Sequence, residues 1–396
     1  MYINESIKTQ VVNEYDVAVC GGGFAGISAA LSAVRQGSKV VLFEKSFMLG
    51  GLATAGLITI YLPLCDGFGK QVSFGIAEEL FRLSIKHGAE ADYPENWLDN
   101  VGVRDENSQR FMVRYNAQLF AILAEQLLIK EGVDIMYGTY VVGVDSNQDK
   151  ISHLITENKS GRRAYKVKSV VDATGDCDVF AFAKVPTNTS SMGNFMSGWY
   201  YSLGENGYEL RRLGAYKPPT RENLLKGKPT ERTFSGVDGA EVSEFTTLSH
   251  RLSYEDFLKL REKDKTAVPV TISTFPQMRM TRKMVGEYTL SDIEEHKYFE
   301  DSIGMVSDWR KRGPVYEVPF RTLYSSSMKN LICAGRCVSV DEPMWDIMRV
   351  IPCCAVTGQA AGIAAAMTDD FTALDVKKLQ QVLVENGVVL HENDLK

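Results

Sequence analysis

Three glycines, Gly21, Gly23 and Gly26, form the pattern G-x-G-x-x-G between an apolar run and an alanine-rich segment. The order predicts a strand, a tight turn and a helix. Gly21 would allow the turn, Gly23 would let the backbone approach a pyrophosphate, and Gly26 would let the helix lie close to the strand. The helix N-terminus supplies N–H donors and partial positive charge. The sequence therefore predicts a dinucleotide-binding β-α-β unit.

An acidic residue completes this unit. A second apolar strand, residues 40–43, ends at Glu44, 18 residues after Gly26. That spacing is close to the ~20 residues at which a carboxylate contacts the ribose hydroxyls of an adenosine. A phosphorylated ribose would be repelled there.

The cysteines are a second candidate for chemistry. The chain has seven, an odd number, with Cys333 and Cys337 four apart and Cys353 and Cys354 adjacent, and it has no C-x-x-C pair. Without a second pair at zinc spacing, no metal site is predicted. Buried thiols in a reducing compartment are the favoured interpretation, and a redox dithiol is the alternative.

Length and composition describe an ordinary globular chain. It has 396 residues, 44% of them hydrophobic and 24% charged, with a formal net charge of −6. Two connected domains are expected. The acidic balance and scattered basic residues argue against a nucleic-acid partner. The polar N-terminus lacks an export signal, so we expect a cytoplasmic protein. The small-residue run 358–366 is too short to cross a membrane and predicts a buried helix.

Further elements are predicted from periodicity. Helices are predicted at 75–87, 115–131, 353–367 and 376–385, and strands at 133–137, 267–272 and 330–334. In the helix at 115–131, the apolar spacing suggests a buried face of Leu119, Ile122, Leu123, Gln126 and Leu127. Residues 141–171 alternate around turns at 147–150 and 158–161, which predicts an antiparallel meander. The apolar run at 170–171 leads into Asp172-Ala173-Thr174-Gly175-Asp176, at the sheet edge where ligands bind.

Residues 186–324 differ in character and indicate an inserted α+β region. Polar, glycine-punctuated stretches give way there to charged helical patches. The predicted division is a dinucleotide-binding domain made of 1–62, 111–185 and 325–396, an excursion or cap at 63–110, and a substrate or cap domain at 186–324.

Several of these stretches together resemble the FAD-dependent oxidoreductases of the glutathione-reductase-like group, in particular a poorly characterised bacterial branch. The stretches are 21–44, 50–54, 172–176, 330–336 with 349–350 and 358–362, and a branch signature at 279–290. The resemblance implies an α/β, Rossmann-like fold with FAD as cofactor. It also implies that the helix beginning near Pro352 directs its N-terminus at the pyrimidine side of the flavin, where reduction places negative charge.

Motif and resemblance together predict the cofactor-binding residues: Gly21, Gly23, Phe24, Ala25, Gly26, Glu44, Lys45, Gly50, Gly51, Leu52, Thr54, Val141, Ala173, Thr174, Gly175, Asp176, Gly335, Arg336, Arg349, Val350 and Ile351. At one of these positions the chain departs from the family pattern. Many relatives carry an acid after the last Ala-Gly, where it meets the ribityl chain, and this chain has Arg336.

The expected chemistry is hydride transfer between a small-molecule substrate and flavin N5. Candidate proton acceptors are His250, Glu287, Tyr288 and Arg349, and a structural role is open for each. Arg279 and Arg282 are candidates for holding an anionic substrate. The alternatives are a flavin-dependent monooxygenase and a non-catalytic flavin-binding protein. No second G-x-G-x-x-G occurs after Gly26, so a resident nicotinamide domain is not expected. Neither substrate identity nor oligomeric state can be predicted from the residues.

Overall fold

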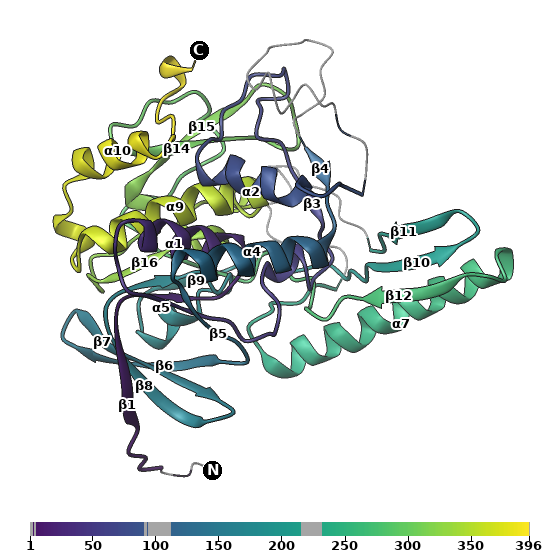
Figure 1. Ribbon diagram of the computed structural model, residues 1–396, viewed down its shortest axis with the longest axis horizontal. Helices are drawn as coiled ribbons and strands as arrows, with labels where there is room; N and C mark the ends of the chain where they lie inside the picture. The colour runs from purple at the N-terminus through teal and green to yellow at the C-terminus, as the bar shows by residue number, and fades with distance from the viewer. Residues whose placement is uncertain (1–2, 4, 91–92, 94–111, 215–231, 396) are drawn as a thin grey trace.

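A parallel β-sheet assembled from separate parts of the chain lies at the centre of the molecule (Figure 1). The computed structural model describes residues 3, 5–90, 93, 112–214 and 232–395. The parallel strands run in the order β5 (Asp134–Met136), β2 (Val40–Phe43), β1 (Gln10–Cys20), β8 (Gly161–Asp172) and β16 (Leu331–Cys333). This arrangement confirms the predicted α/β, Rossmann-like fold.

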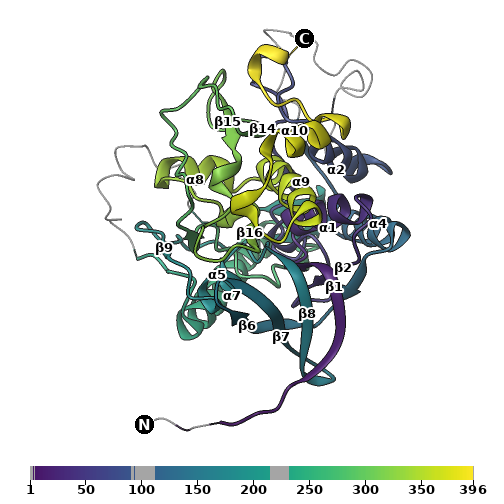
Figure 2. The same cartoon turned by 90° about the vertical axis from the view of Figure 1, so that its left-hand side faces the viewer.

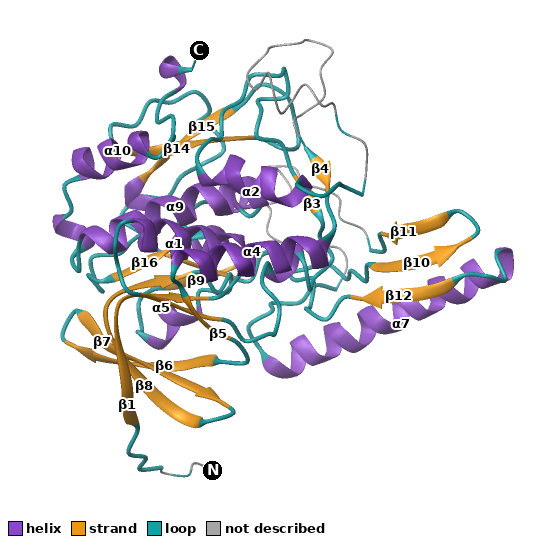
Figure 3. Cartoon of the chain, viewed as in Figure 1, coloured by secondary structure: helices purple, strands orange, loops and turns teal. Residues whose placement is uncertain are grey.

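Strand β8 belongs to two pairings at once. Its carboxyl end pairs with β16, and its earlier part pairs with the antiparallel strand β7 (Lys150–Asn158). β7 in turn pairs with β6 (Tyr140–Asn147), so the predicted meander is confirmed. Because β8 is shared, the meander continues the central sheet, as Figure 3 shows.

The remaining described elements are η1 (Gly51–Ala53), β3 (Ile60–Tyr61), α2 (Ile76–Ile85), β4 (Val113–Arg114), α4 (Ala117–Glu131), α5 (Asp178–Phe182), β9 (Thr187–Thr189), β10 (Tyr200–Gly204), β11 (Gly207–Arg211), α7 (Gly239–Lys263), β12 (Val268–Ile272), β13 (Arg282–Met284), β14 (Ser302–Ser307), β15 (Val315–Pro319), η2 (Phe320–Thr322), η3 (Gly335–Cys337), α8 (Glu342–Met348), η4 (Phe371–Ala373), α10 (Val376–Glu385) and η5 (Glu392–Asp394), together with the helices α1 (Phe24–Arg35) and α9 (Ile351–Met367).

Helices α1 and α9 lie side by side against the parallel sheet (Figures 1 and 2). Two glycines of α9 allow the close approach. A Cβ on Gly358 would lie 2.3 Å from the carbonyl oxygen of Ala25, and one on Gly362 would lie 2.2 Å from that of Ala29. From Ile351 to Ala365 every residue of α9 except Cys354 is buried, which confirms the predicted buried helix.

The predicted face of α4 is confirmed only in part, since Leu119, Leu123 and Leu127 are half-buried and Leu127 packs against the core, but the most deeply buried residues are others. Ile122 is 57% exposed, whereas Phe120, Ala124 and Leu128 are buried. Phe120 stacks on Phe24 of α1 with ring centroids 4.4 Å apart. Small alanines on this face allow α4 to pack closely against α1, so shape complementarity outweighs the row of larger apolar side chains.

Four elements of the inserted region, β10, β11, α7 and β12, form an arm that projects from the body, whereas β14 packs against α9 and α10 in the body (Figure 1). The arm's three-stranded sheet, in the order β11-β10-β12, lies beside α7, a helix of 25 residues of which only Phe245 and Ser253 are buried. Strand β12 matches the strand predicted at 267–272. Of the predicted excursion at 63–110, residues 91–92 and 94–110 lie outside the described residues, and the described part holds α2.

Within the described ranges, no single helix is both long and apolar enough to cross a membrane. Helices α8 and α9 together have the necessary length and composition, but the chain bends by 88° between them.

Candidate cofactor and substrate site

The glycine-rich turn between β1 and α1 leaves no space for two side chains. Gly21 has φ of +104°, and a Cβ there would lie 2.5 Å from the carbonyl oxygen of Ala173. A Cβ on Gly26 would lie 1.8 Å from the carbonyl oxygen of Gly21. Both neighbours are backbone atoms, so strand, turn and helix can stay this close only with glycine.

Gly23 faces open space instead. No atom lies within 4 Å of the position its Cβ would take. Helix α1 starts at the next residue without a side-chain cap, and the ring of Phe24 turns inward to stack on Phe120. The first N–H groups of a helix have no partner inside it. Open space before an uncapped helix N-terminus fits an anionic pyrophosphate.

Glu44 is buried and already holds the turn. One of its carboxylate oxygens accepts a hydrogen bond from the Gly22 N–H at 2.7 Å, and the other accepts bonds from the N–H and hydroxyl of Ser46 at 2.7 and 2.8 Å. A carboxylate offers about four acceptor positions. Glu44 therefore holds the glycine-rich turn in place, a role that the sequence did not indicate, and the predicted contact with the ribose would be made in addition.

The second glycine-rich loop packs against the first. The Gly50 N–H donates to the carbonyl oxygen of Gly22 at 2.8 Å, and a Cβ on Gly51 would lie 3.5 Å from the Cα of Gly23. Leu52 lies in the short helix η1, and the Thr54 hydroxyl donates back to the carbonyl oxygen of Leu49. The loop residues proposed for the flavin thus lie beside those proposed for the pyrophosphate.

Arg336 connects the edge of the sheet to the inserted region. Its guanidinium donates to the carbonyl oxygens of Met278 and Arg279, both at 3.0 Å, and to the carboxylate of Asp176 at 3.3 Å. Asp176 also accepts from Thr281 and lies 4.0 Å from the Lys45 ammonium. Arg336, which departs from the family pattern, therefore stabilises the contact between the edge of the central sheet and the inserted region.

This cluster surrounds the end of β8. Gly175 has φ of +77°, and a Cβ there would lie 2.3 Å from the Arg336 guanidinium. Thr174 donates to Asp172, while Ala173 is buried beside Gly21. Gly335 also leaves no space, since its Cβ would lie 2.8 Å from that of Ala25.

The corner between α8 and α9 brings three predicted residues to one place. Val350 is the N-cap of α9 and provides no side-chain hydrogen bond, and Ile351 begins the helix. Arg349, 8% exposed, donates from Nε and Nη2 to Oδ1 of the fully buried Asp346, at 2.8 and 2.5 Å. Its guanidinium also lies over the ring of Trp309. Asp346 was not predicted, although its position three residues before Arg349 on a helix is the available signal.

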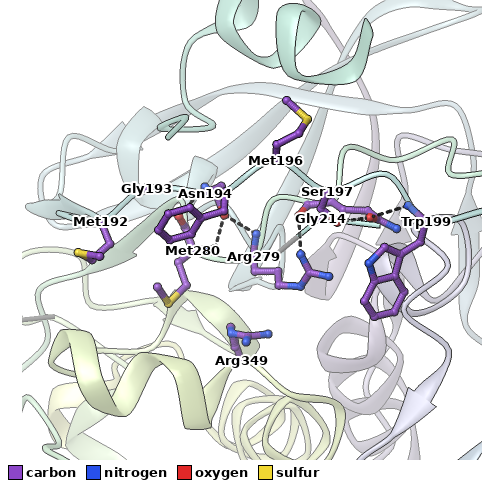
Figure 4. A pocket seen from close by; sticks show the side chains of 12 residues that line it. Met192, Gly193, Asn194, Met196, Ser197, Trp199, Gly214, Arg279, Met280 and Arg349 are labelled. Carbon is purple, nitrogen blue, oxygen red and sulfur yellow. Dashed lines mark hydrogen bonds between the residues drawn. The ribbon is translucent and has the colours of Figure 1, made fainter. Parts of the chain in front are cut away.

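A pocket that is partly open to solvent lies between this corner and the inserted region, and we call it the cavity (Figure 4). Arg349 lines it from the corner, and Arg279 lines it from the branch signature. Its apolar wall comes from Met192, Phe195, Met196, Trp199 and Met280. No local sequence pattern indicates these wall residues.

Other predicted site residues lie elsewhere. Arg282 donates to the backbone of Asp176 and pairs with Asp178 at 2.7 Å, so it braces the start of α5. The Tyr288 hydroxyl donates to Glu294, and burial together with that hydrogen bond raises its pKa. Exposed Glu287 accepts from the Ser326 N–H. Neither Glu287 nor Tyr288 lines the cavity.

Two more predictions concern single positions. His250 is exposed on α7 and lines a smaller hollow that shares Ser197, Trp199 and Gln277 with the cavity. Val141 lies half-buried on β6, where it pairs with Thr156 of β7.

All seven cysteines are free, and six of them are buried, which agrees with the predicted structural thiols. The side chains of Asp172, Cys177 and Cys337 place ligand-type atoms within 4.8 Å of one another. However, Asp172 accepts hydrogen bonds from the Thr174 hydroxyl and from the N–H groups of Val179 and Phe180. Burial also raises the pKa of the Cys177 thiol. The cluster therefore has a structural explanation, in which Asp172 holds the start of α5.

Comparisons with known proteins identify the family. The sequence model of a family described as FAD dependent oxidoreductase matches residues 16–198 and 246–383. A tRNA uridine 5-carboxymethylaminomethyl modification enzyme, MnmG, of Aquifex aeolicus is 31% identical over 176 residues, 42% of this chain and 25% of that protein. The MnmG of Ligilactobacillus salivarius is 23% identical over 65% of this chain and 38% of its own length. The chain thus spans well under half the length of these relatives.

A solved structure agrees on the fold. A geranylgeranyl bacteriochlorophyll reductase-like protein from Thermoplasma acidophilum superposes with a TM-score of 0.50 and 15% identity, covering 94% of this chain and 84% of its own. The open space at Gly23, the uncapped α1 and the adjoining second loop fit an FAD molecule. The chain belongs to the FAD-dependent oxidoreductase family, and FAD is its cofactor.

Proposed function

We propose that this enzyme transfers a hydride between a small-molecule substrate and the flavin, with the substrate held in the cavity between the α8–α9 corner and the inserted region. When bound, FAD supplies the two-electron chemistry at N5. The substrate would exchange a hydride and, separately, a proton.

The position of the cavity carries the proposal. The cavity is lined both by Arg349, next to the N-cap of α9, and by residues of the inserted region such as Trp199 and Arg279. The family resemblance implies that the flavin ring lies next to the N-terminus of α9. A substrate in this cavity would therefore lie between cofactor and inserted region.

The chain's own residues would bind and orient the substrate. The Arg336 cluster fixes the segment 278–281 against the sheet, which keeps one wall of the cavity in place. The apolar wall excludes water from the substrate. Asp346 holds the Arg349 guanidinium in one orientation.

The test is anaerobic reduction of the purified holoenzyme by a panel of metabolites, measured as the loss of visible flavin absorption. A substrate that bleaches the flavin within seconds supports the proposal. Because Trp199 lines the cavity, Trp199→Ala should slow this reduction at equal FAD content.

The monooxygenase alternative gives a different result. Such an enzyme would consume oxygen together with a nicotinamide reductant, and its substrate would not bleach the flavin in the absence of oxygen. That pattern would contradict the hydride-transfer proposal.

The named relatives modify tRNA, but we propose a small molecule for this chain. The formal net charge of −6 disfavours approach to a phosphate backbone. We also propose a cytoplasmic location, supported by seven free thiols.

A further inference from the structure

We propose that the cavity selects a substrate with a carboxylate on an apolar body, and that Arg279 and Arg349 bind this carboxylate. The inference rests on the proposed function, because it assigns the cavity to the substrate. It goes further by naming the chemical class that the cavity accepts.

The two charged side chains of the described lining are arginines, and Arg349 is paired with Asp346. Two arginines line the cavity, and of its described lining residues none is an aspartate or a glutamate. Figure 4 shows that the two arginine side chains line the same cavity from two different segments. Arg279 belongs to the segment 279–290, and Arg349 lies at the corner before α9. Guanidinium groups match carboxylates with paired N–H donors.

The neutral polar residues of the lining are used by the protein itself. The Asn194 carbonyl oxygen accepts the N–H groups of Arg279 and Met280, and its amide donates to the carbonyl oxygens of Phe234 and Met280. The Ser197 hydroxyl donates to the Gln277 side chain. The Gln277 amide in turn donates to the carbonyl oxygen of Gly56. These residues shape the cavity, and we assign recognition of the polar group to the arginines.

The two guanidinium groups are held in place before any substrate binds. Asp346 takes donors on one edge of Arg349, and Trp309 lies against its face. Arg279 lies over the ring of Trp199, 5.3 Å from its centroid, and donates to the carbonyl oxygen of Gln277. Aromatic contacts and hydrogen bonds limit rotation, which lowers the entropy lost when an anion binds.

The apolar wall determines the rest of the substrate. Met192 and Met280 are buried, and Phe195, Met196 and Trp199 are half-buried around the same space. Methionine side chains adapt to irregular apolar shapes. An aromatic or aliphatic carboxylic acid fits these surroundings better than a sugar or a phosphate ester.

The experiment compares matched acids and amides on the holoenzyme. Benzoate and benzamide, and hexanoate and hexanamide, are titrated to millimolar concentration while the visible flavin spectrum and the thermal unfolding temperature are followed. We expect at least one carboxylate to perturb the spectrum and raise the unfolding temperature, with an affinity about tenfold or more above that of its amide.

Three variants locate the binding. Arg279→Gln should raise the carboxylate Kd about tenfold with FAD content unchanged. Arg349→Gln alone would remove two hydrogen bonds from the buried Asp346 carboxylate, which also lies 3.8 Å from Arg310, so the double variant Arg349→Gln/Asp346→Asn is used to remove both charges. Arg310 keeps its ion pair with Asp308 in this variant. Arg251→Gln, on the exposed side of α7 and paired with Glu255, is the matched control and should leave the Kd unchanged.

Amides that bind as tightly as their acids would overturn the inference, as would a holoenzyme that responds to neither carboxylate. A Kd that is unchanged in both arginine variants would also overturn it. The proposed function can fail separately. If carboxylates bind through the arginines but no metabolite reduces the flavin, hydride transfer fails and this inference stands. If an uncharged metabolite reduces the flavin and carboxylates do not bind, hydride transfer stands and the inference about a carboxylate fails.

Discussion

The contact between α1 and α9 and the arm around α7 are built in opposite ways. In the first, backbone atoms approach so closely that Gly358 and Gly362 of α9 have no space for a Cβ, and at the start of α1 Gly26 is packed as closely against Gly21. In the second, a helix of 25 residues buries only two of them. A region that holds a cofactor through its backbone depends on individual glycines, whereas an exposed arm tolerates change at most positions.

The largest expected effect tests the close-packed side of this comparison at Gly26. Gly26→Ala would place a Cβ 1.8 Å from the carbonyl oxygen of Gly21. We expect the purified protein to retain little FAD and to lose about 1–3 kcal/mol of unfolding free energy, since turn and helix must separate. Flavin absorbance per protein and urea unfolding measure the two effects.

Gly23→Ala separates binding from folding. Its Cβ would meet no atom within 4 Å, so the unfolding free energy of the apoprotein should change by less than about 0.5 kcal/mol. The added methyl would nevertheless occupy the space proposed for the pyrophosphate, and FAD content should fall. Retention of FAD in Gly23→Ala would contradict the placement of the pyrophosphate.

The contributions of Asp172 and Asp264 to the unfolding free energy should change with pH in opposite directions. Burial raises the pKa of Asp172 to about 6, so the folded state holds its proton more tightly than the unfolded state. The stability from this group is therefore complete below about pH 4 and is lost as the pH rises through 6, by roughly 3 kcal/mol. Urea unfolding of wild type and Asp172→Asn from pH 4 to 7 should show this difference.

Asp264, at the end of α7, is the matched control. A hydrogen bond from the Thr266 hydroxyl and others from backbone N–H groups hold the pKa of this half-buried carboxylate below its usual range. Its contribution to stability is present at neutral pH and is lost as the pH falls through its folded pKa. Equal slopes for Asp172→Asn and Asp264→Asn would refute the contrast.

Arg336→Gln tests the connection between the two regions. The change removes donors to Met278, Arg279 and Asp176. We expect a loss of about 2 kcal/mol in unfolding free energy, typical of hydrogen bonds to a charged group. Since Arg279 and Met280 line the cavity, substrate affinity should fall as well. Arg336→Lys should restore part of the stability through Asp176; no recovery would argue against the ion pair.

Gly239→Ala should stabilise the protein, in contrast to Arg336→Gln. Gly239 begins α7, and its Cβ would meet no atom within 4 Å. Alanine favours a helix over glycine, so we expect a gain of about 0.5 kcal/mol in urea unfolding. A loss of stability would show that the arm is packed more tightly than its exposure indicates.

The smallest expected effect is at His250. The side chain is exposed and lies on the smaller hollow rather than in the cavity. We expect His250→Gln to change the rate of flavin reduction by less than about twofold, because proton transfer requires contact with the reacting group. Rapid-reaction absorbance measures this rate, and a large decrease would restore His250 as proton acceptor.

The close-packed region could be predicted from the sequence better than the arm. Local patterns specify backbone geometry directly: glycine spacing predicted the turn at Gly21–Gly26, alternation around turns predicted the meander, and a run of small residues predicted the buried helix α9. Side-chain surroundings depend on distant partners. Ile122 was expected on the buried face of α4, but Phe120 occupies that face and stacks on Phe24 of α1. Likewise, no local pattern shows that Arg336 reaches Met278, or that Trp199 borders a cavity.

The corner between α8 and α9 has an evolutionary consequence. Arg349 and Val350 are consecutive, yet Arg349 lines the cavity that we propose for the substrate and Val350 is the N-cap of α9, the helix that we propose is directed at the flavin. Each residue added to a helix rotates the remainder of that helix by about 100°. A single insertion here would therefore disturb the cavity and the start of α9 at once, whereas the loop at 192–199 contributes to the cavity wall alone. Descendants of this enzyme should acquire new substrates by changing that loop, and the length of the corner should stay fixed.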